Sequence, residues 1–172
     1  MSLGHLGSLY SDMGDYSKAE SYYLEALSIY KSVLGESHPD YATSLNNLGL
    51  LYSDMGDYSK TESYYLEALS IYKSLLGESH PDYATSLNNL GSLYKNMGDY
   101  SKAEQYLLEA LSIRKSVLGE THPHYATSLN NLGSLYIKMG DYSKAEPYYL
   151  EAMNLYKSVL GETHANYATL LN

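Results

Sequence analysis

Adjacent asparagines recur at three places in the chain and are its first candidates for chemistry. They lie in the stretch YATSLNNLG, which occurs at 41–49, 83–91 and 125–133. An asparagine side chain offers N–H donors and a carbonyl acceptor, so it can bond the backbone of an extended peptide whatever that peptide's sequence. Asparagine is also a mediocre helix former, because its amide competes for backbone hydrogen bonds. Its repetition inside a predicted helix therefore favours a binding role.

Patterns that would indicate catalysis are absent from the sequence. None of the motifs GxxxxGK[ST], GxGxxG, GxSxG or HExxH occurs, and these are the patterns of phosphate binding, nucleophilic catalysis and zinc catalysis. The chain has no cysteine, which excludes a thiolate nucleophile and a disulfide framework. Glu62, Glu67 and their copies are predicted to lie on the exposed side of a helix. We therefore expect no enzyme and no cofactor.

The histidines are better explained by helix starts than by metal binding. The tripeptide His-Pro-Asp occurs at 38–40 and 80–82, and proline is favoured in the first turn of a helix because its missing N–H is not needed there. Only His124 is placed to approach His122, and zinc sites in proteins generally use four ligands. We expect no metal site.

Charge and hydropathy narrow the class of partner. The chain has 172 residues and a net charge of −9, with no cluster of lysine or arginine, so neither nucleic acid nor an anionic membrane is an expected partner. No basic segment followed by an apolar one opens the sequence, so no secretory signal is predicted. No apolar run approaches the ~20 residues that cross a bilayer. These features predict a soluble, cytoplasmic protein.

A repeat of 42 residues organises the chain. Gly49, Gly91 and Gly133 are spaced by this period, and the same copying accounts for 22 tyrosines beside no phenylalanine or tryptophan. A fixed period of this size predicts a solenoid in which each unit contacts mainly its neighbours. We expect a single repeat domain over 1–172. It comprises a partial repeat at 1–41, full repeats at 42–83, 84–125 and 126–167, and a stub of a fifth at 168–172.

Each repeat is predicted to be two antiparallel helices. The first helix of the second repeat should run from Pro39 to about Met55, because proline suits the first turn. A capping box of Ser59 and Glu62 is predicted to start the second helix, which should end at Gly77, a typical helix-terminating residue. The fold class predicted is all-α.

The repeat pattern resembles a known family. The matching positions in the second repeat are Leu45, Leu48, Gly49, Tyr52, Gly56, Asp57, Tyr58, Tyr65 and Ala68. They follow the tetratricopeptide repeat, with Thr61 where that pattern has alanine. The usual period is 34 residues, and the longer repeat with endings such as VLGESHPDYAT resembles the 42-residue repeats of kinesin light chains. The resemblance implies a right-handed superhelical solenoid of antiparallel helix pairs, whose first helices line a concave groove for peptides or partner proteins.

One face of each first helix is the candidate binding surface. At about 100° per residue, Leu45, Leu48 and Tyr52 share one face, and the asparagines lie opposite. The resemblance implies that this opposite face lines the peptide groove. Its residues are Thr43, Asn46, Asn47, Asp54, Thr85, Asn88, Asn89, Ser92, Lys95, Asn96, Thr127, Asn130, Asn131, Ser134 and Lys138. The predicted function is that of a non-catalytic scaffold or adaptor that binds extended peptide segments of a protein partner.

The asparagines also admit structural explanations. The two groups are Asn46, Asn88 and Asn130, first in each pair, and Asn47, Asn89 and Asn131, second in each pair. Ligand contact is favoured for the first group, whereas a bond to the adjacent repeat is an equally open explanation for the second. Recent duplication would also copy a feature without selecting it. The alternative function is a structural array that associates with itself or spaces fused domains.

Charges on the candidate surface predict a polarised ligand. Asp12 and Asp54 lie in the first two repeats, and Lys95 and Lys138 lie in the last two. We expect peptides with a basic end and an acidic end, set antiparallel to this gradient.

The two ends of the repeat array predict head-to-tail self-association. Both look like cut surfaces of a longer array, and matching ends make a contact that does not close on itself. The apolar residues concerned are Leu3, Leu6, Gly7 and Tyr10 at one end, and Tyr148, Tyr149, Ala152, Leu155 and Tyr156 at the other, with Tyr167, Ala168 and Leu171 of the stub.

Overall fold

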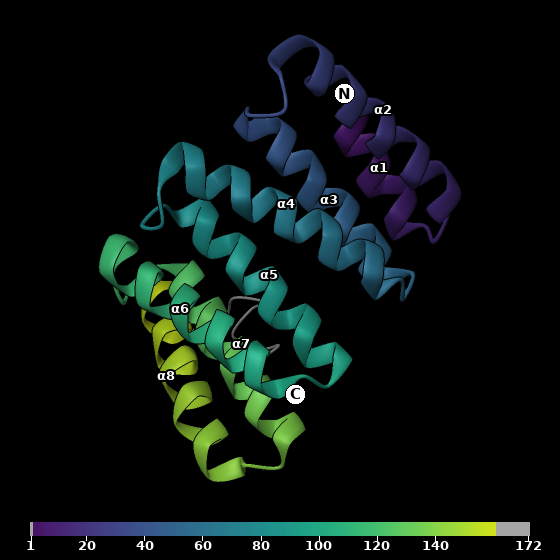
Figure 1. Ribbon diagram of the computed structural model, residues 1–172. Helices are drawn as coiled ribbons and strands as arrows, with labels where there is room; N and C mark the ends of the chain where they lie inside the picture. The colour runs from purple at the N-terminus through teal and green to yellow at the C-terminus, as the bar shows by residue number, and fades with distance from the viewer. Residues whose placement is uncertain (1, 161–172) are drawn as a thin grey trace. The chain divides into compact units, whose positions relative to one another are not determined.

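Helices account for almost all of residues 2–160, which are the residues described by the computed structural model. Eight helices and no strand occur in this range (Figure 1). They are α1 (Leu3–Asp12), α2 (Tyr16–Leu34), α3 (Pro39–Asp54), α4 (Tyr58–Leu76), α5 (Pro81–Met97), α6 (Tyr100–Leu118), α7 (Pro123–Met139) and α8 (Tyr142–Leu160). The chain divides into two compact units, Met1–Glu78 and Ser79–Asn172.

Unit 1, Met1–Glu78, consists of two helical hairpins. Helices α1 and α2 pack against each other, as do α3 and α4, and α2 also packs against α3. The side chains of Ala19 and Tyr23 from α2 meet Leu48, Leu51 and Tyr52 from α3 in a buried cluster. The apolar face predicted for the first helix is thus the face that α3 buries.

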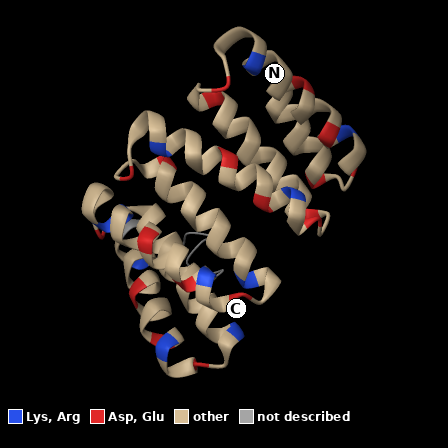
Figure 2. Ribbon diagram, viewed as in Figure 1, with Lys and Arg blue, Asp and Glu red and all other residues tan. Residues whose placement is uncertain are grey.

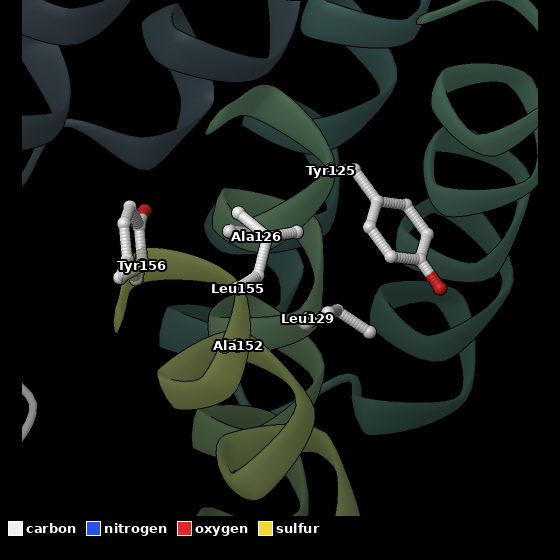
Figure 3. Close-up of a cluster of buried hydrophobic side chains, with 6 residues drawn as sticks. All are labelled: Tyr125, Ala126, Leu129, Ala152, Leu155 and Tyr156. Atoms are coloured by element: carbon white, nitrogen blue, oxygen red, sulfur yellow. The ribbon is translucent and has the colours of Figure 1, made fainter. Parts of the chain in front are cut away.

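Unit 2, Ser79–Asn172, repeats this arrangement with α5 to α8. Helix α6 lies between its hairpin partner α5 and the next helix, α7, while α7 pairs with α8. Figure 3 shows the buried cluster that joins the last pair, with Ala126 and Leu129 of α7 facing Ala152, Leu155 and Tyr156 of α8. Tyr148 also packs against this cluster, and Tyr149 lies against Gly133 of α7, so all five α8 residues expected at an open end are packed within unit 2.

Helix starts are set by residues that the sequence analysis identified only in part. The ring Nδ1 of His38 accepts a hydrogen bond from the Asp40 N–H at 3.1 Å, and Pro39 occupies the first turn of α3. This bears out the helix-start explanation of the His-Pro-Asp tripeptide. The capping box of Ser59 and Glu62 is wrong, because α4 begins earlier and Asp57 caps it by accepting from the Lys60 N–H at 3.2 Å.

A left-handed glycine ends each second helix whose end is described. Gly77 has φ +82 and follows Leu76, where the helix was predicted to stop. An L residue with a side chain rarely adopts this conformation, whereas glycine does so without steric cost.

Close contact between paired helices depends on a second glycine. A Cβ on Gly49 of α3 would lie 2.4 Å from Cε1 of Tyr65 on α4. The tyrosine ring therefore lies directly on the glycine backbone and is only 4% exposed. In α6 the equivalent side chain is Leu107, which lies in the same way against Gly91.

Tyrosine hydroxyls join neighbouring helices through glutamates. Tyr41 of α3 donates to Glu67 of α4 at 3.2 Å, and Tyr52 of α3 donates to Glu20 of α2. In unit 2, Tyr125 of α7 donates to Glu151 of α8 at 2.7 Å. Glu67 and Glu151 lie on the exposed side of their helices, as predicted, whereas Glu20 is half-buried. Each also accepts a hydrogen bond from an adjacent helix.

Some predictions fall where the structure gives no test. The stub at 168–172 and the preceding Tyr167 lie outside the described residues. In residues 2–160 no helix combines the length and the apolar character that a bilayer crossing requires.

Candidate functional site

The fifteen residues of the candidate surface lie on α3, α5 and α7, the first helices of their hairpins. Most are half-buried, which is typical of side chains along a helix edge beside a neighbouring helix. Thr43, Asp54, Asn96 and Lys138 are exposed, and Asn88 is buried.

A hydrogen bond between two side-chain amides links the two first helices of unit 2. Asn131 Nδ2 on α7 donates to Asn88 Oδ1 on α5 at 2.8 Å. Asn88, for which ligand contact was favoured, is only 7% exposed and bonds to the adjacent repeat instead. Asn131 makes the inter-repeat bond that was left open for it. The half-buried amides of Asn89 and Asn130 flank this pair.

A lysine pair lies along the same two helices. Lys95 Nζ on α5 donates to Ser134 Oγ on α7 at 3.0 Å. Burial lowers the pKa of Lys95, and the charge of Lys138 on α7 lowers it further. Neither lysine forms a salt bridge with any carboxylate in residues 2–160. Elsewhere, basic residues are dispersed along the helices (Figure 2), except that Arg114 and Lys115 are adjacent in α6.

Unit 1 carries the opposite charge at the corresponding place. Asp54 at the end of α3 has its pKa raised by burial and by the nearby charge of Asp12 on α1. Burial raises the pKa of Tyr23, which lies within the influence of both carboxylates. The structure therefore brings the two acidic residues of the predicted gradient together.

Threonines of the candidate surface form hydrogen bonds within their own helical hairpins. Thr43 Oγ1 bonds the Pro39 carbonyl at 3.0 Å and lies 2.8 Å from the Tyr72 hydroxyl on α4. Thr85 Oγ1 likewise bonds the Pro81 carbonyl at 3.0 Å. These hydroxyls have little capacity left for a ligand.

Arg114 is a functional candidate that the sequence analysis missed. It lies on α6, is 3% exposed, and donates to Ser128 Oγ at 2.8 Å, to the His124 carbonyl at 3.1 Å and to Thr85 Oγ1 at 3.2 Å. Burial lowers its pKa to about 10. The available signal was a break in the repeat, because the same position holds Tyr30 and Tyr72 in earlier repeats.

A cavity of about 340 Å³ opens in unit 1 between α1, α2 and α3. Asn47 of the candidate surface lines it, together with Gly4 and His5 of α1, Tyr30 of α2 and Asp40 of α3. Gly4 and His5 stand where the later repeats have the Asn-Asn pair. Thr43 and Asn47 of the candidate surface therefore border a cavity in unit 1.

The histidine pair does not form a metal site within residues 2–160. The rings of His122 and His124 lie 5.0 Å apart between centroids, as their spacing allowed. No group of three or more metal-ligating side chains occurs in this part of the chain. Burial lowers the pKa of His124, and the charge of Arg114 acts in the same direction.

Comparison with known proteins places these helix pairs in a family. The model of the tetratricopeptide repeat matches residues 1–74, 54–116, 82–158 and 125–172. The solved structure of BtubC (BKLC) from P. vanneervenii matches with a TM-score of 0.80 and 31% identity. The match covers 95% of this chain and 65% of BtubC, so this chain spans less than two thirds of that protein's length.

A second structure supports the fold alone, at lower identity. The kinesin light chain-like, nearly identical TPR-like repeats of Podosopora anserina match with a TM-score of 0.80 and 20% identity, over 98% of this chain and 80% of theirs. No curated protein matched the sequence. The prediction of an all-α solenoid of antiparallel helix pairs with kinesin light chain-like repeats is confirmed. This chain belongs to the tetratricopeptide repeat family, whose repeats generally mediate protein–protein interaction.

Proposed function

We propose that the protein is a non-catalytic scaffold that binds extended peptide segments of a partner protein along its first helices. The observation that carries the proposal is the environment of Lys95. This cation is half-buried beside α7 and lies near a second lysine, yet within residues 2–160 it donates to the hydroxyl of Ser134 and forms no salt bridge. A partly desolvated charge without a counterion is costly, and an acidic ligand side chain would offset that cost.

Amides beside Lys95 supply the groups that a peptide backbone needs. Asn89 and Asn130 are half-buried on the same two helices. The Oδ1 atom of Asn130 is buried and accepts no hydrogen bond within the described residues, and an unsatisfied buried acceptor costs free energy. Rotation of the Asn130 side chain on ligand binding would bring this acceptor to a ligand N–H. Neighbouring helices lie about 10 Å apart and an extended peptide advances about 3.3 Å per residue, so one repeat would serve about three peptide residues.

The two units favour different ends of the ligand. Asp12 and Asp54 in unit 1 suit a basic peptide residue, and Lys95 and Lys138 in unit 2 suit an acidic one. The proposed ligand is therefore an extended peptide that has both a basic and an acidic segment. Binding should weaken with salt, because exposed charge pairs each contribute about 0–1 kcal/mol and are screened.

The experiment selects peptides from a display library and measures their affinity by fluorescence polarisation. The test variant is Asn89→Ala with Asn130→Ala, which removes two amides without touching the Asn88–Asn131 bond. We expect about tenfold weaker binding or more for every selected peptide, whatever its sequence, because each lost hydrogen bond costs about 0.5–1.5 kcal/mol.

Two control variants make this experiment specific. Asn154→Ala removes an exposed amide from the second helix α8 and should leave affinity unchanged. Lys138→Gln should weaken the binding of acidic peptides. Lys115→Gln on α6 should leave that binding unchanged, because Lys115 Nζ already lies 2.6 Å from Glu120 Oε1. Full affinity in the double asparagine variant would contradict the proposed amide contacts.

A further inference from the structure

Three residues that line the cavity between α1, α2 and α3 have counterparts that bond one another in unit 2. Shifting the cavity residues by two repeats places Tyr30 at Arg114, Asp40 at His124 and Ser44 at Ser128. Arg114 therefore stands where unit 1 has Tyr30, and its guanidinium bonds the counterparts of Asp40 and Ser44. Unit 2 thus shows that acceptors in this arrangement can bind a guanidinium.

Arg114 provides a template for the bonds. Its Nη1 donates to Ser128 Oγ at 2.8 Å and to the His124 carbonyl at 3.1 Å. Unit 1 presents the same two acceptors, since the Ser44 hydroxyl and the Asp40 carbonyl lie together at 3.0 Å, as their counterparts do at 3.4 Å. In unit 1, α2 carries Tyr30 at the position of Arg114, and Tyr30, Asp40 and Ser44 all line the cavity.

Two further replacements open the unit 1 cavity and make it more acidic. Gly4 stands where unit 2 has Asn88, so no side chain from α1 reaches Asn47 in the way that Asn88 reaches Asn131. Asp40, one of the residues that line the cavity, stands where unit 2 has His124. The Asp40 carboxylate lies 3.8 Å from His38 Nδ1, and its side chain is 57% exposed.

We propose that this cavity binds an arginine side chain of the partner's peptide. The guanidinium would donate to the Asp40 carboxylate and to Ser44 Oγ, and the Asn47 carboxamide would offer a further acceptor. A carboxylate matches the planar fork of arginine in a two-bond geometry, and the ring of Tyr30 can contact the cation face-on. The volume of about 340 Å³ lies at the lower end of ligand pockets, which suits one side chain.

Selectivity for arginine over lysine follows from this geometry. Lysine is a compact point charge that cannot bond a carboxylate and a hydroxyl in one plane, so the two residues are not interchangeable at such a site. Citrulline keeps the shape of arginine but lacks the charge, so it separates the effect of the carboxylate from that of shape.

The experiment uses the full chain and three probes: acetyl-arginine amide and its lysine and citrulline analogues. Binding is followed by NMR shifts of the backbone amides of Gly4, His5 and Asn47. We expect saturable shifts with the arginine probe and at least about tenfold weaker binding of the other two probes. Equal shifts with all three probes, or none with arginine, would overturn the proposal.

Variants test the cavity without unfolding the chain. Gly4→Asn restores the residue of the other repeats, and a Cβ at Gly4 meets only Ser2 Oγ at 3.9 Å, so the variant should fold. Gly4→Asn and Asp40→Asn should each abolish saturable binding of the arginine probe. Asp82→Asn makes the same change at the start of α5 and should leave binding intact. Binding that survives Gly4→Asn would contradict the assignment to this cavity.

The inference rests on the proposed function only for the source of the arginine. If the arginine probe binds but the selected peptides do not, the cavity is an arginine site and the scaffold function fails. If the peptides bind but replacing each of their arginines by lysine changes nothing, the scaffold function stands and the arginine site fails.

Discussion

Single residues that differ between the repeats distinguish unit 1 from unit 2. Arg114 replaces the tyrosine found at Tyr30, Tyr72 and Tyr156, and it buries a charge in unit 2 that meets three neutral acceptors. No carboxylate pairs with it in residues 2–160. Because a buried charge without a counterion is expensive, these hydrogen bonds offset only part of the cost of placing Arg114 there.

Arg114→Tyr should therefore stabilise the protein. The new hydroxyl can approach Thr85 as the Tyr72 hydroxyl approaches Thr43 at 2.8 Å, and the desolvation cost of the guanidinium disappears. We expect the free energy of unfolding to rise by about 1 kcal/mol or more, measured by urea titration at neutral pH. Arg114→Ala is the control, since it leaves a cavity and should lower stability. An equal loss in both variants would show that the arginine contributes net stability.

At the scale of the helix, caps and close contacts explain why these segments are well defined. Asp57 bonds the Lys60 N–H at the start of α4, and Gly77 with φ +82 ends that helix. Between them, Tyr65 lies against the backbone of Gly49. Each feature recurs in the other repeats, so its effect is multiplied along the chain.

The cap assignment can be tested by removing each candidate hydroxyl or carboxylate. Asp57→Ala should lower the free energy of unfolding by about 1 kcal/mol, because it leaves an N–H of the first turn of α4 without its acceptor. Ser59→Ala should change it by less than about 0.5 kcal/mol. Thermal denaturation followed by circular dichroism would measure both. A larger loss from Ser59→Ala would restore the capping box that the sequence predicted.

The contact between Tyr65 and Gly49 predicts a large effect of truncation. Tyr65→Ala removes a side chain that is 4% exposed and should cost about 3–5 kcal/mol in a denaturant titration. Tyr65→Leu should cost less, because Leu107 fills the same place in α6. A loss under about 1 kcal/mol for Tyr65→Ala would show that the ring is not part of the core.

The helices could be predicted because their ends depend on residues close together in the sequence. Hydrogen bonds between side chains that are distant in the sequence could not be predicted. Gly77 marked a helix end because only glycine adopts that backbone conformation readily. The partner of Asn88 is Asn131, and no pattern within one repeat shows that bond. The cap was missed because Asp57 and Ser59 are both good capping residues, and only the backbone geometry distinguishes them.

Across the whole molecule, buried tyrosine hydroxyls should make the free energy of unfolding depend on pH in alkaline solution. Burial and the neighbouring Glu67 raise the pKa of Tyr41 to about 12, and the pKa values of Tyr52, Tyr125 and Tyr136 are raised further by burial and by their glutamate partners. In the unfolded chain a tyrosine ionises near its ordinary pKa of 10.0. The unfolded state therefore releases protons first as the pH rises.

Stability should consequently fall as the pH rises above about 10. Below that value both states keep the tyrosine protons, so these groups add no pH dependence there. Urea titrations between about pH 9 and pH 12 would measure the slope. Tyr41→Phe keeps the ring but removes an ionising group, so its slope should be smaller than that of the unchanged protein. An equal slope would exclude Tyr41 as a contributor.

Peptide binding along the first helices can be tested most directly by mapping where a peptide binds. Side-chain amide signals of asparagine can be followed by NMR while a selected peptide is titrated into the full chain. We expect shifts for Asn89 and Asn130 on the first helices α5 and α7, and no shift for Asn154 on the second helix α8. Shifts confined to Asn154 and its neighbours, with Asn89 and Asn130 unchanged, would contradict peptide binding along the first helices.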